Sequence, residues 1–342
     1  MRTIFAALCL ILPLFAQDVV VAKSPTSENL RGVSTPSAEV AWASGTHGTY
    51  LRSLDSGATW QAAQVPGAES LDFRDVEAFS ADVAYLLAAG PGEQSRIYKT
   101  TDGGKTWALQ FTNREPKGFY DCMAFWNRER GIAVGDPVDG KFELIVTNDG
   151  GASWKAIPKG KLDPPTAIGG EGAFAASGTC IATEGNSNVW FATGGTTARI
   201  FHSTDAGRSW VWSPSPIVHG EASSGIFSIA FRDAKHGVIV GGDYKQPEKD
   251  GPNLAFTNDG GRTWRLGWAS PQAYFSAVAF PYKNRSAILV AGSSQAAYLG
   301  NLTAKSWTKI WNLNLNAISV RPDGSAIAVG PKGAIVVFPP IR

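Results

Sequence analysis

The chain has 342 residues, which fits one large domain or two ordinary ones, and its formal net charge is +2. Hydrophobic residues make up 44% of it, with 12 Trp and 17 Phe, enough for a large buried core, while 38 Gly and 20 Pro indicate many turns. The charges are balanced and form no basic run or acidic tail, which excludes the electrostatic footprint of a nucleic-acid-binding protein.

The first residues, MRTIFAALCLILPLFAQ, have the pattern of a secretory signal peptide. Arg2 precedes an apolar run over residues 4–15, and Ala16 follows where a signal peptidase could cut, with Ala22 as a second such position. We therefore expect a signal peptide over 1–16, a single mature domain over 17–342, and a periplasmic or secreted location. An uncleaved membrane anchor is the alternative. No later segment approaches the roughly 18 uninterrupted apolar residues of a membrane-spanning helix.

One eight-residue motif occurs five times along the chain. The copies are SLDSGATW (53–60), TTDGGKTW (100–107), TNDGGASW (147–154), STDAGRSW (203–210) and TNDGGRTW (257–264). A sixth, GNLTAKSW (300–307), keeps Ser306 and Trp307 but lacks the Asp and both Gly. Successive Trp residues are 47, 47, 56, 54 and 43 residues apart, and a period in this range is typical of propellers and repeat arrays.

Three short β-like runs precede each copy of the motif, and a fourth follows its Trp. In the first unit the three runs are LRGVS, VAWAS and TYLRS, and WALQFT is a fourth run from the second unit. The second run of each unit is rich in Val, Ile and Ala, which is typical of a strand buried on both faces. The pattern predicts seven units of four strands.

The seventh unit supplies only three strands, whereas DVVVA (18–22), near the start of the chain, belongs to no unit. Pairing of DVVVA with AIVVF (334–338) would complete the last sheet and remove open sheet edges. We therefore predict an all-β fold, a seven-bladed β-propeller with four-stranded antiparallel blades, closed by the N-terminal strand. Insertions at 160–178 and 243–253 account for the two longer Trp intervals, and their Gly, Pro and charged residues indicate loops.

Two cysteines remain in the mature chain, Cys122 and Cys180, both in apolar strand-like runs. Because Cys is among the residue types most often buried, we expect two buried free thiols. The alternative is a disulfide, which an oxidising compartment permits and which requires the two Cα atoms to lie within about 7 Å.

The repeated motif has the composition of a tight turn between the third and fourth strands. Its Asp can accept backbone N–H bonds across the bend, the Gly two residues later can adopt a positive φ, and the Ser or Thr hydroxyl can brace the hairpin. The Trp is expected to pack between neighbouring blades. A functional interpretation would require five equivalent sites around the rim, so we interpret the motif as structural.

These residues resemble the Asp-box, or BNR, repeat S/T-x-D-x-G-x-T-W of sialidases, sortilin-type receptors, and photosystem II assembly and stability factors. The longer pattern GIAVGDPVDGKFELIVTNDGGASW (131–154) looks most like the photosystem II assembly-factor family, and the resemblance covers nearly all of the mature chain. It implies a single seven-bladed propeller, often exported, with relatives in organisms that lack photosystems. The motif indicates a fold more strongly than an activity, because one fold hosts many functions.

A ligand is expected on the face opposite the repeated turns, among the loops that join blade to blade and second strand to third. The blade-entry residues are Arg31, Arg74, Asp75, Tyr120, Asp121, Glu171, Glu221 and Tyr274. The other loops add His47, Arg96, Asp136, Arg199, Asp243, Tyr244, Lys245 and Lys249. Mixed charges and aromatic side chains that converge on a funnel suit recognition of a polar ligand. The predicted ligand-binding residues are Arg31, Arg74, Tyr120, Asp121, Glu221, Asp243 and Tyr274; the alternative is a solvated rim of strand ends.

A sialidase-like glycoside hydrolase is an alternative function. It would need clustered arginines, a Tyr activated by a Glu, and an acid/base Asp, because glycosyl transfer uses two positioned protonatable groups. The candidates are Arg31, Arg74, Arg199, Tyr274 and Glu221. Two departures argue against it: the Arg-Ile-Pro signature of sialidases is absent, with LRGVS where it would stand, and sialidase propellers have six blades. A glycan-binding propeller would use Tyr120, Tyr244 and Tyr274.

Other chemistry has no support in the sequence. The four His lack a ligand spacing such as H-E-x-x-H, and CxxC is absent, so we expect no metal or other cofactor. Neither a G-x-S-x-G elbow nor a Walker lysine occurs. We therefore predict an exported, non-catalytic monomer that binds a protein or an extended ligand, with assembly or stability of an envelope complex as its expected role. Membrane contact is expected only through a partner or an uncleaved signal, and no contact with nucleic acid is expected.

Overall fold

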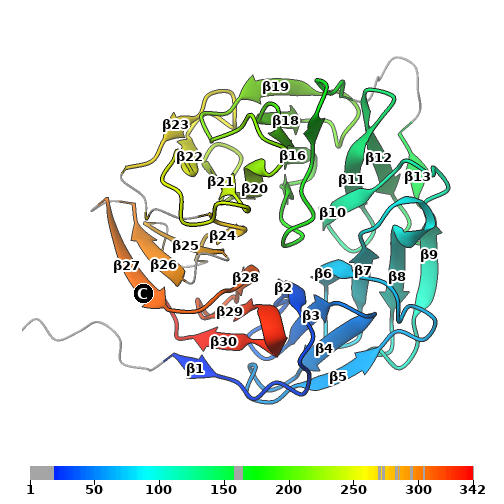
Figure 1. Ribbon diagram of the computed structural model, residues 1–342. Coiled ribbons are helices and arrows are strands. Elements are labelled where there is room, and N and C mark those ends of the chain that lie inside the picture. Colours follow the sequence, from blue (N-terminus) through cyan, green and yellow to red (C-terminus); the bar gives the residue numbers. More distant parts are fainter. Residues whose placement is uncertain are drawn as a thin grey trace, which may run out of the picture.

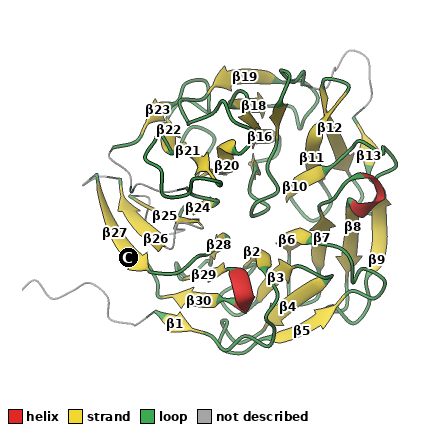
Figure 2. Ribbon diagram, in the orientation of Figure 1, coloured by secondary structure: helices red, strands yellow, loops and turns green. Residues whose placement is uncertain are grey.

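Seven antiparallel sheets surround a central axis in the computed structural model, which describes residues 19–157, 165–268, 271, 274–281, 284, 286–292, 296–302 and 305–341 (Figure 1). Nearly all regular elements of these residues are strands (Figure 2). Two short 3-10 helices, η1 (Gly92–Gln94) and η2 (Pro331–Gly333), interrupt them. The predicted all-β, seven-bladed propeller is confirmed.

Each blade has four strands, counted here as first to fourth from the axis outwards. Blades 1 to 3 contain β2 (Leu30–Ser34), β3 (Ala41–Gly45), β4 (Thr49–Ser53) and β5 (Gln61–Gln64); β6 (Phe73–Ala78), β7 (Ala84–Ala88), β8 (Arg96–Thr100) and β9 (Ala108–Thr112); β10 (Tyr120–Phe125), β11 (Gly131–Val138), β12 (Lys141–Thr147) and β13 (Lys155–Ala156). Blades 4 and 5 contain β15 (Ile181–Glu184), β16 (Asn188–Ala192), β18 (Arg199–Ser203) and β19 (Val211–Pro214); β20 (Ser224–Phe231), β21 (Gly237–Asp243), β22 (Leu254–Thr257) and β23 (Arg265–Leu266). Blades 6 and 7 contain β24 (Ala277–Ala279), β25 (Ala287–Gly292), β26 (Ala296–Asn301) and β27 (Ser306–Trp311); β28 (Ala317–Val320), β29 (Ala326–Val329), β30 (Ile335–Phe338) and β1 (Val20–Val21).

The ring closes by pairing of the two ends of the chain. Val20 pairs with Val337 and Val21 with Val336, and the N–H of Ala22 donates to the carbonyl of Ile335 at 3.1 Å. In Figure 1 the blue β1 lies beside the red β30. The predicted closure by the N-terminal strand is confirmed, while the predicted signal peptide, residues 1–16, lies outside the described residues.

The two insertions differ in structure. Residues 244–253 form the predicted loop between β21 and β22. The prediction of a loop over 160–178 is wrong in part, because β14 (Glu171–Gly172) pairs with β17 (Gly194–Gly195) and extends the sheet of blade 5. The pairing of β17 with β20 needs glycine: a Cβ on Gly194 would lie 2.8 Å from the Cα of Gly225. Residues 158–164 of this region are outside the described part.

The hydrophobic core lies between adjacent blades. Between blades 4 and 5, for example, Trp190 and Ile200 pack with Ile229, Ile239 and Trp264, the last residue of a repeated turn. Aromatic rings of this size bury much apolar surface. The predicted position of the motif Trp between blades is therefore confirmed here.

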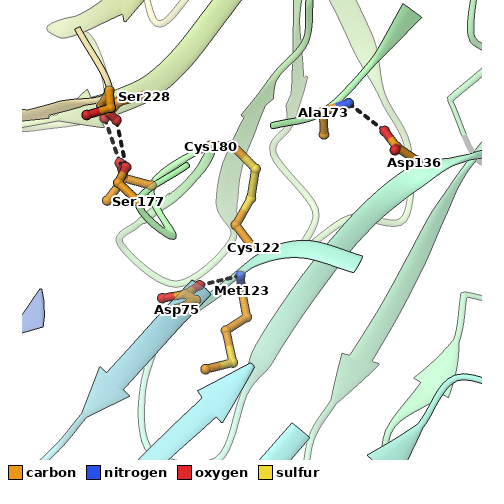
Figure 3. Close-up of a disulfide and its surroundings, with 10 residues drawn as sticks. Asp75, Cys122, Met123, Asp136, Ala173, Ser177, Cys180 and Ser228 are labelled. Atoms are coloured by element: carbon orange, nitrogen blue, oxygen red, sulfur yellow. Dashed lines mark hydrogen bonds between the residues drawn. A yellow bond between two sulfur atoms is a disulfide. The ribbon is translucent and has the colours of Figure 1, made fainter. Parts of the chain in front are cut away.

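Cys122 of β10 and Cys180, directly before β15, form a disulfide with their Cα atoms 6.1 Å apart (Figure 3). The prediction of two free thiols is wrong. The first strands of blades 3 and 4 are neighbours at the axis, so two buried cysteines that are 58 residues apart in sequence meet across the blade boundary.

Candidate functional site

The repeated turns are held by side-chain hydrogen bonds. In blade 2, Asp102 accepts the N–H of Thr106 at 2.9 Å and its hydroxyl at 2.7 Å, while the Thr100 hydroxyl accepts the N–H of Gly104 at 2.9 Å. The bonds from Thr106 lower the pKa of Asp102 to about 2. The carboxylates of Asp55, Asp149, Asp205 and Asp259 accept the same pair of bonds. The motif therefore has the turn chemistry that its composition predicts.

These turns lie beside the loops that join the first strand of a blade to its second. The N–H of Gly103 donates to the carbonyl of Asp82 at 3.1 Å, and that of Gly150 to the carbonyl of Glu129 at 2.8 Å. We call this side of the ring the turn face. The loops that enter each blade, and those that join its second strand to its third, lie on the opposite side, the loop face.

A β-bulge near the start of the first strand occurs in four blades. The pairing of first and second strands skips Arg31 in β2, Arg74 in β6, Asp121 in β10 and Phe227 in β20. A bulge leaves its extra residue out of the ladder and can redirect the side chain. All four skipped residues line one cavity at the axis.

This central cavity has a volume of about 570 Å³, within the usual range for ligand sites. Every blade contributes to its lining, which consists of Arg31, Arg74, Phe119, Asp121, Asp136, residues 173–176, Phe227, Tyr244, Tyr274, Ser276 and Asn316. Four predicted ligand-binding residues thus meet in one place: Arg31, Arg74, Asp121 and Tyr274.

Arg31 and Arg74 give the cavity a positively charged side. Within the described residues, the Nε of Arg31 has no hydrogen-bond partner. Burial and, next, the charge of Arg74 lower the pKa of Arg31. Arg74 is fixed, because its Nε donates to Asp72 and its Nη1 donates to the carbonyl of Ala175 at 2.9 Å. In the described structure, Arg31 therefore has an unpaired donor, whereas two nitrogens of Arg74 are engaged.

Asp121 and Asp136 of blade 3 give the cavity a negatively charged side. Asp121 is only 2% exposed, and its Oδ2 has no hydrogen-bond partner in the described part of the chain. Burial and, next, the charge of Asp136 raise the pKa of Asp121 well above its usual value. Asp136 accepts the N–H of Ala173 at 2.9 Å, as Figure 3 shows, and burial raises its pKa to about 6.

Aromatic side chains from blades 4 to 6 form a third side. Phe174 stacks on Phe227 with ring centroids 4.0 Å apart, and Tyr274 meets the edge of Phe227 at 4.7 Å. Burial raises the pKa of Tyr274. Tyr244 is the exposed member of the group, at 47%. The pairing of β14 with β17 positions the residues that follow β14, and Phe174 is one of them.

Glu221 and Asp243, two further predicted residues, line a second cavity of about 450 Å³ on the loop face. Lys245 and Lys249 lie at the same cavity. Asp243 accepts the N–H of Lys245 at 2.9 Å and the side chain of Gln246 at 3.0 Å, so it stabilises its own loop. Consecutive residues line the two cavities: Tyr244 lines the central cavity, while Asp243 and Lys245 line the second one.

Tyr120, another predicted ligand-binding residue, lines neither of these two cavities. It is 2% exposed, and its ring meets the edge of Phe111 at 5.4 Å inside the protein. Tyr120 still pairs with Gly135 in the ladder, and the bulge begins only at the next residue. The one-residue difference sends Asp121, rather than Tyr120, to the cavity.

Arg199 and Glu171 form a buried ion pair outside the central cavity. The Nε of Arg199 donates to Glu171 Oε1 at 2.9 Å, and the side chains are 7% and 0% exposed. The guanidinium carbon of Arg199 lies over the rings of Phe201 and Trp212. The three arginines that a sialidase-like site would need are therefore not assembled.

The remaining sequence candidates have local roles. His47 contacts Glu28 at 2.7 Å, and the Nε of Arg96 donates to the carbonyl of Glu93 at 2.7 Å. Asp75 accepts the N–H of Met123 at 2.7 Å and so links blades 2 and 3 (Figure 3).

Sequence reasoning missed Phe119, Phe174, Phe227, Ser276 and Asn316 as cavity residues. Phe227 could have been found by its place in FSIAF, at the start of a first-strand run like LRGVS. Phe174 had no such signal, because it lies in an insertion outside the repeat.

Within the described ranges, no three His, Cys, Asp or Glu side chains gather as a metal site would require. In the same residues, no helix has the length and apolar character needed to cross a bilayer.

Comparison with known proteins finds sequence similarity to a photosystem II assembly protein. No family model matches it. The photosystem II assembly protein Ycf48 of Synechococcus sp. (strain JA-2-3B'a(2-13)) is 27% identical over 263 residues, which is 65% of this chain and 70% of that protein. The resemblance to photosystem II assembly factors that the motifs predict is confirmed at this level.

Solved structures match over almost the whole chain. YCF48 bound to a D1 peptide is 16% identical, with a TM-score of 0.63 over 95% of this chain and 98% of that one. YCF48 from Cyanidioschyzon merolae is 19% identical, with a TM-score of 0.65 over 95% and 99%. A GH74 enzyme from Niastella koreensis is 16% identical, with a TM-score of 0.64 over 94% of this chain and 53% of its own. At these identities the structures show a shared fold.

Proposed function

We propose that this chain is an exported, non-catalytic propeller that binds an extended segment of a protein partner in the central cavity, and that it aids assembly or stability of an envelope complex. The observation that carries the proposal is the convergence of Arg31, Arg74, Asp121 and Tyr274 on one cavity of about 570 Å³. The similarity to Ycf48 supports it, since one such protein has been solved with a D1 peptide.

Export is supported by the Cys122–Cys180 disulfide, because disulfides persist mainly in oxidising compartments. We propose a periplasmic or secreted location for this reason and from the N-terminal sequence.

A glycan is a weaker candidate for the ligand. Arg199 lies in a separate ion pair with Glu171, and Tyr120 is buried away from the cavity. Of the three tyrosines that a glycan-binding site would use, only Tyr244 and Tyr274 line the cavity. The GH74 enzyme shares the fold, which does not decide between the two functions.

Site-specific photo-crosslinking tests the proposal. A benzoylphenylalanine in place of Tyr244 would lie at the central cavity, and one in place of Leu54, which is 51% exposed in a repeated turn, would lie on the turn face. We expect the Tyr244 position to crosslink a single protein in intact cells, and the added substitution Arg31→Glu to abolish this. The Leu54 position is the control.

Crosslinks that are equal from both positions, or that persist with Arg31→Glu, would place the partner elsewhere. Turnover of fluorogenic sialosides or glucosides by the purified protein would contradict the non-catalytic assignment.

A further inference from the structure

On the acidic side of the central cavity, one buried carboxyl oxygen lacks a hydrogen-bond partner within the described chain. Asp121 is 2% exposed, yet its Oδ2 has no hydrogen-bond partner among the described residues. A buried acceptor without a partner costs free energy, and a charged one costs more. The bulge in β10 nevertheless directs this carboxylate into the cavity.

The neighbouring groups do not supply the missing partner. The charge of Arg74 and backbone hydrogen bonds from Ala175 and Asp136 lower the pKa of Asp121, yet its Oδ2 has no partner in the described part of the chain. The Nε and Nη1 of Arg74 donate elsewhere, to Asp72 and to the carbonyl of Ala175. Asp136 adds a second carboxyl group, which in the described part of the chain accepts the N–H of Ala173. The two carboxylates therefore fix the segment 173–175 and still have capacity for a cation.

The other cation of the cavity stands apart from this pair. Arg31 belongs to blade 1, Arg74 to blade 2, and Asp121 and Asp136 to blade 3. In the order of the blades, Arg74 thus lies between a positive end at Arg31 and an acidic end at Asp121 and Asp136. A ligand that fits both ends must itself carry separated charges.

The lining favours an organic cation over a metal ion. Within the described chain the site has two carboxylates and no third His, Cys, Asp or Glu that would complete a metal site. Phe174 and Phe227 line the same cavity, and aromatic faces attract the alkyl stem and the charge of a Lys or Arg side chain.

We propose that the central cavity selects a polypeptide segment with a Lys or Arg side chain, whose cationic group binds Asp121 and Asp136 and whose stem packs on Phe174 and Phe227. The inference rests on the proposed function, because it specifies the kind of segment that the cavity accepts. The basic side chain enters from the loop face and supplies the hydrogen-bond donor that Asp121 Oδ2 lacks.

A positional-scanning library of N-acetylated hexapeptides with free carboxyl termini tests the proposal on the mature protein. Acetylation removes the competing α-amine, and norleucine serves as the neutral match of lysine. We expect the protein to retain Lys or Arg over norleucine at one position by about tenfold or more, the effect of one charge-assisted hydrogen bond.

Three variants read out the position of the cation. Asp121→Asn and Asp136→Asn should each remove most of the preference, whereas Asp139→Asn, an 82% exposed carboxylate on the same blade and face, should keep it. Because Asp136 is the less buried of the pair, its variant carries the test if Asp121→Asn fails to fold, as judged by circular dichroism.

Each outcome separates the two proposals. Retention of peptides without a basic preference, or a preference that survives both Asp121→Asn and Asp136→Asn, overturns the inference and leaves the proposed function standing. If no peptide of any composition is retained, the peptide-binding function itself is contradicted, and the inference falls with it.

Discussion

Cys122 and Cys180 are joined by a disulfide across the boundary between blades 3 and 4, with their Cα atoms 6.1 Å apart. The residue before Cys122 is the cavity residue Asp121, and the residue after it, Met123, donates its N–H to Asp75 of blade 2 at 2.7 Å. Three blades are therefore tied together directly beside the central cavity.

Removal of the disulfide should destabilise the propeller. The double variant Cys122→Ala and Cys180→Ala should lose about 2–4 kcal/mol of unfolding free energy, because the bond closes a long loop in the unfolded chain. Denaturant unfolding measures this. Dithiothreitol should destabilise the wild-type protein and leave the variant unchanged; an equal response of both to the reductant would show that the cysteines are not bonded.

The Trp residues of the repeated turns should contribute more to stability than exposed Trp residues. Trp264→Ala should cost about 3–5 kcal/mol, because the ring is 9% exposed and packs between blades 4 and 5. Trp212→Ala is the matched control: this ring is 57% exposed and stacks on Arg199, so its loss should cost about 1 kcal/mol or less. Similar losses in thermal or denaturant unfolding would contradict the assignment of the core to the blade boundaries.

The ion pair of Glu171 and Arg199 should matter for folding rather than for binding. Glu171→Gln should cost about 3 kcal/mol or more, since it leaves the 7% exposed Arg199 as an uncompensated buried charge. Glu93→Gln, in the exposed pair with Arg114, should cost less than about 1 kcal/mol. Crosslinking from the Tyr244 position should be unchanged in folded Glu171→Gln protein, and a selective loss of crosslinking would assign this pair to the ligand site.

Asp102 should make the stability of blade 2 depend on acid pH. Its pKa is lowered to about 2 by the bonds from Thr106, against about 3.9 in an unfolded chain. Because its pKa is lower in the folded state, the Asp102 carboxylate stabilises the fold at pH values above its pKa in the unfolded chain. This contribution disappears as the pH falls towards 2. Asp102→Asn should therefore be less stable than wild type at pH 7 and approach it near pH 2. Unfolding curves across this range measure the difference, and one that does not change with pH would refute the explanation.

Closure of the ring should depend on the backbone of the N-terminal strand. Ala22→Pro removes the N–H that donates to Ile335 and should loosen β1 from β30. An open edge at β30 should then raise protease sensitivity and aggregation. Lys23→Pro, one residue beyond the N–H of Ala22, serves as the control for the presence of proline alone. If limited proteolysis detects no difference between the two variants, the closing strand contributes little.

Much of the fold could be predicted because the residues of each repeated turn interact mainly with one another. The Asp, Gly and Trp of each turn act within a few residues, as the bonds of Asp102 to Thr106 illustrate, so their pattern is visible in the sequence. Likewise, the last unit of the chain supplies only three strands and DVVVA near the N-terminus belongs to no unit, so each is the natural partner of the other. Val20 does pair with Val337.

The site was predicted only in part, because it depends on shifts of one residue. Asp121 and Tyr120 are neighbours in the sequence, and only the bulge in β10 sends one to the cavity and the other into the core. The sequence predicts a loop over 160–178, yet the pairing of Glu171 with Gly195 places Phe174 on the cavity wall.

The sequence alone determined the number of blades, the chemistry of the turns and the strand that closes the ring, because these follow from local hydrogen bonding and from hydrophobic periodicity. The tertiary structure decided which side chains face the axis, that Cys122 reaches Cys180, and that Arg199 binds Glu171 instead of joining Arg31. These contacts join residues that are far apart in the chain, and they are set by the packing of neighbouring blades and by bulges, neither of which leaves a periodic trace in the sequence.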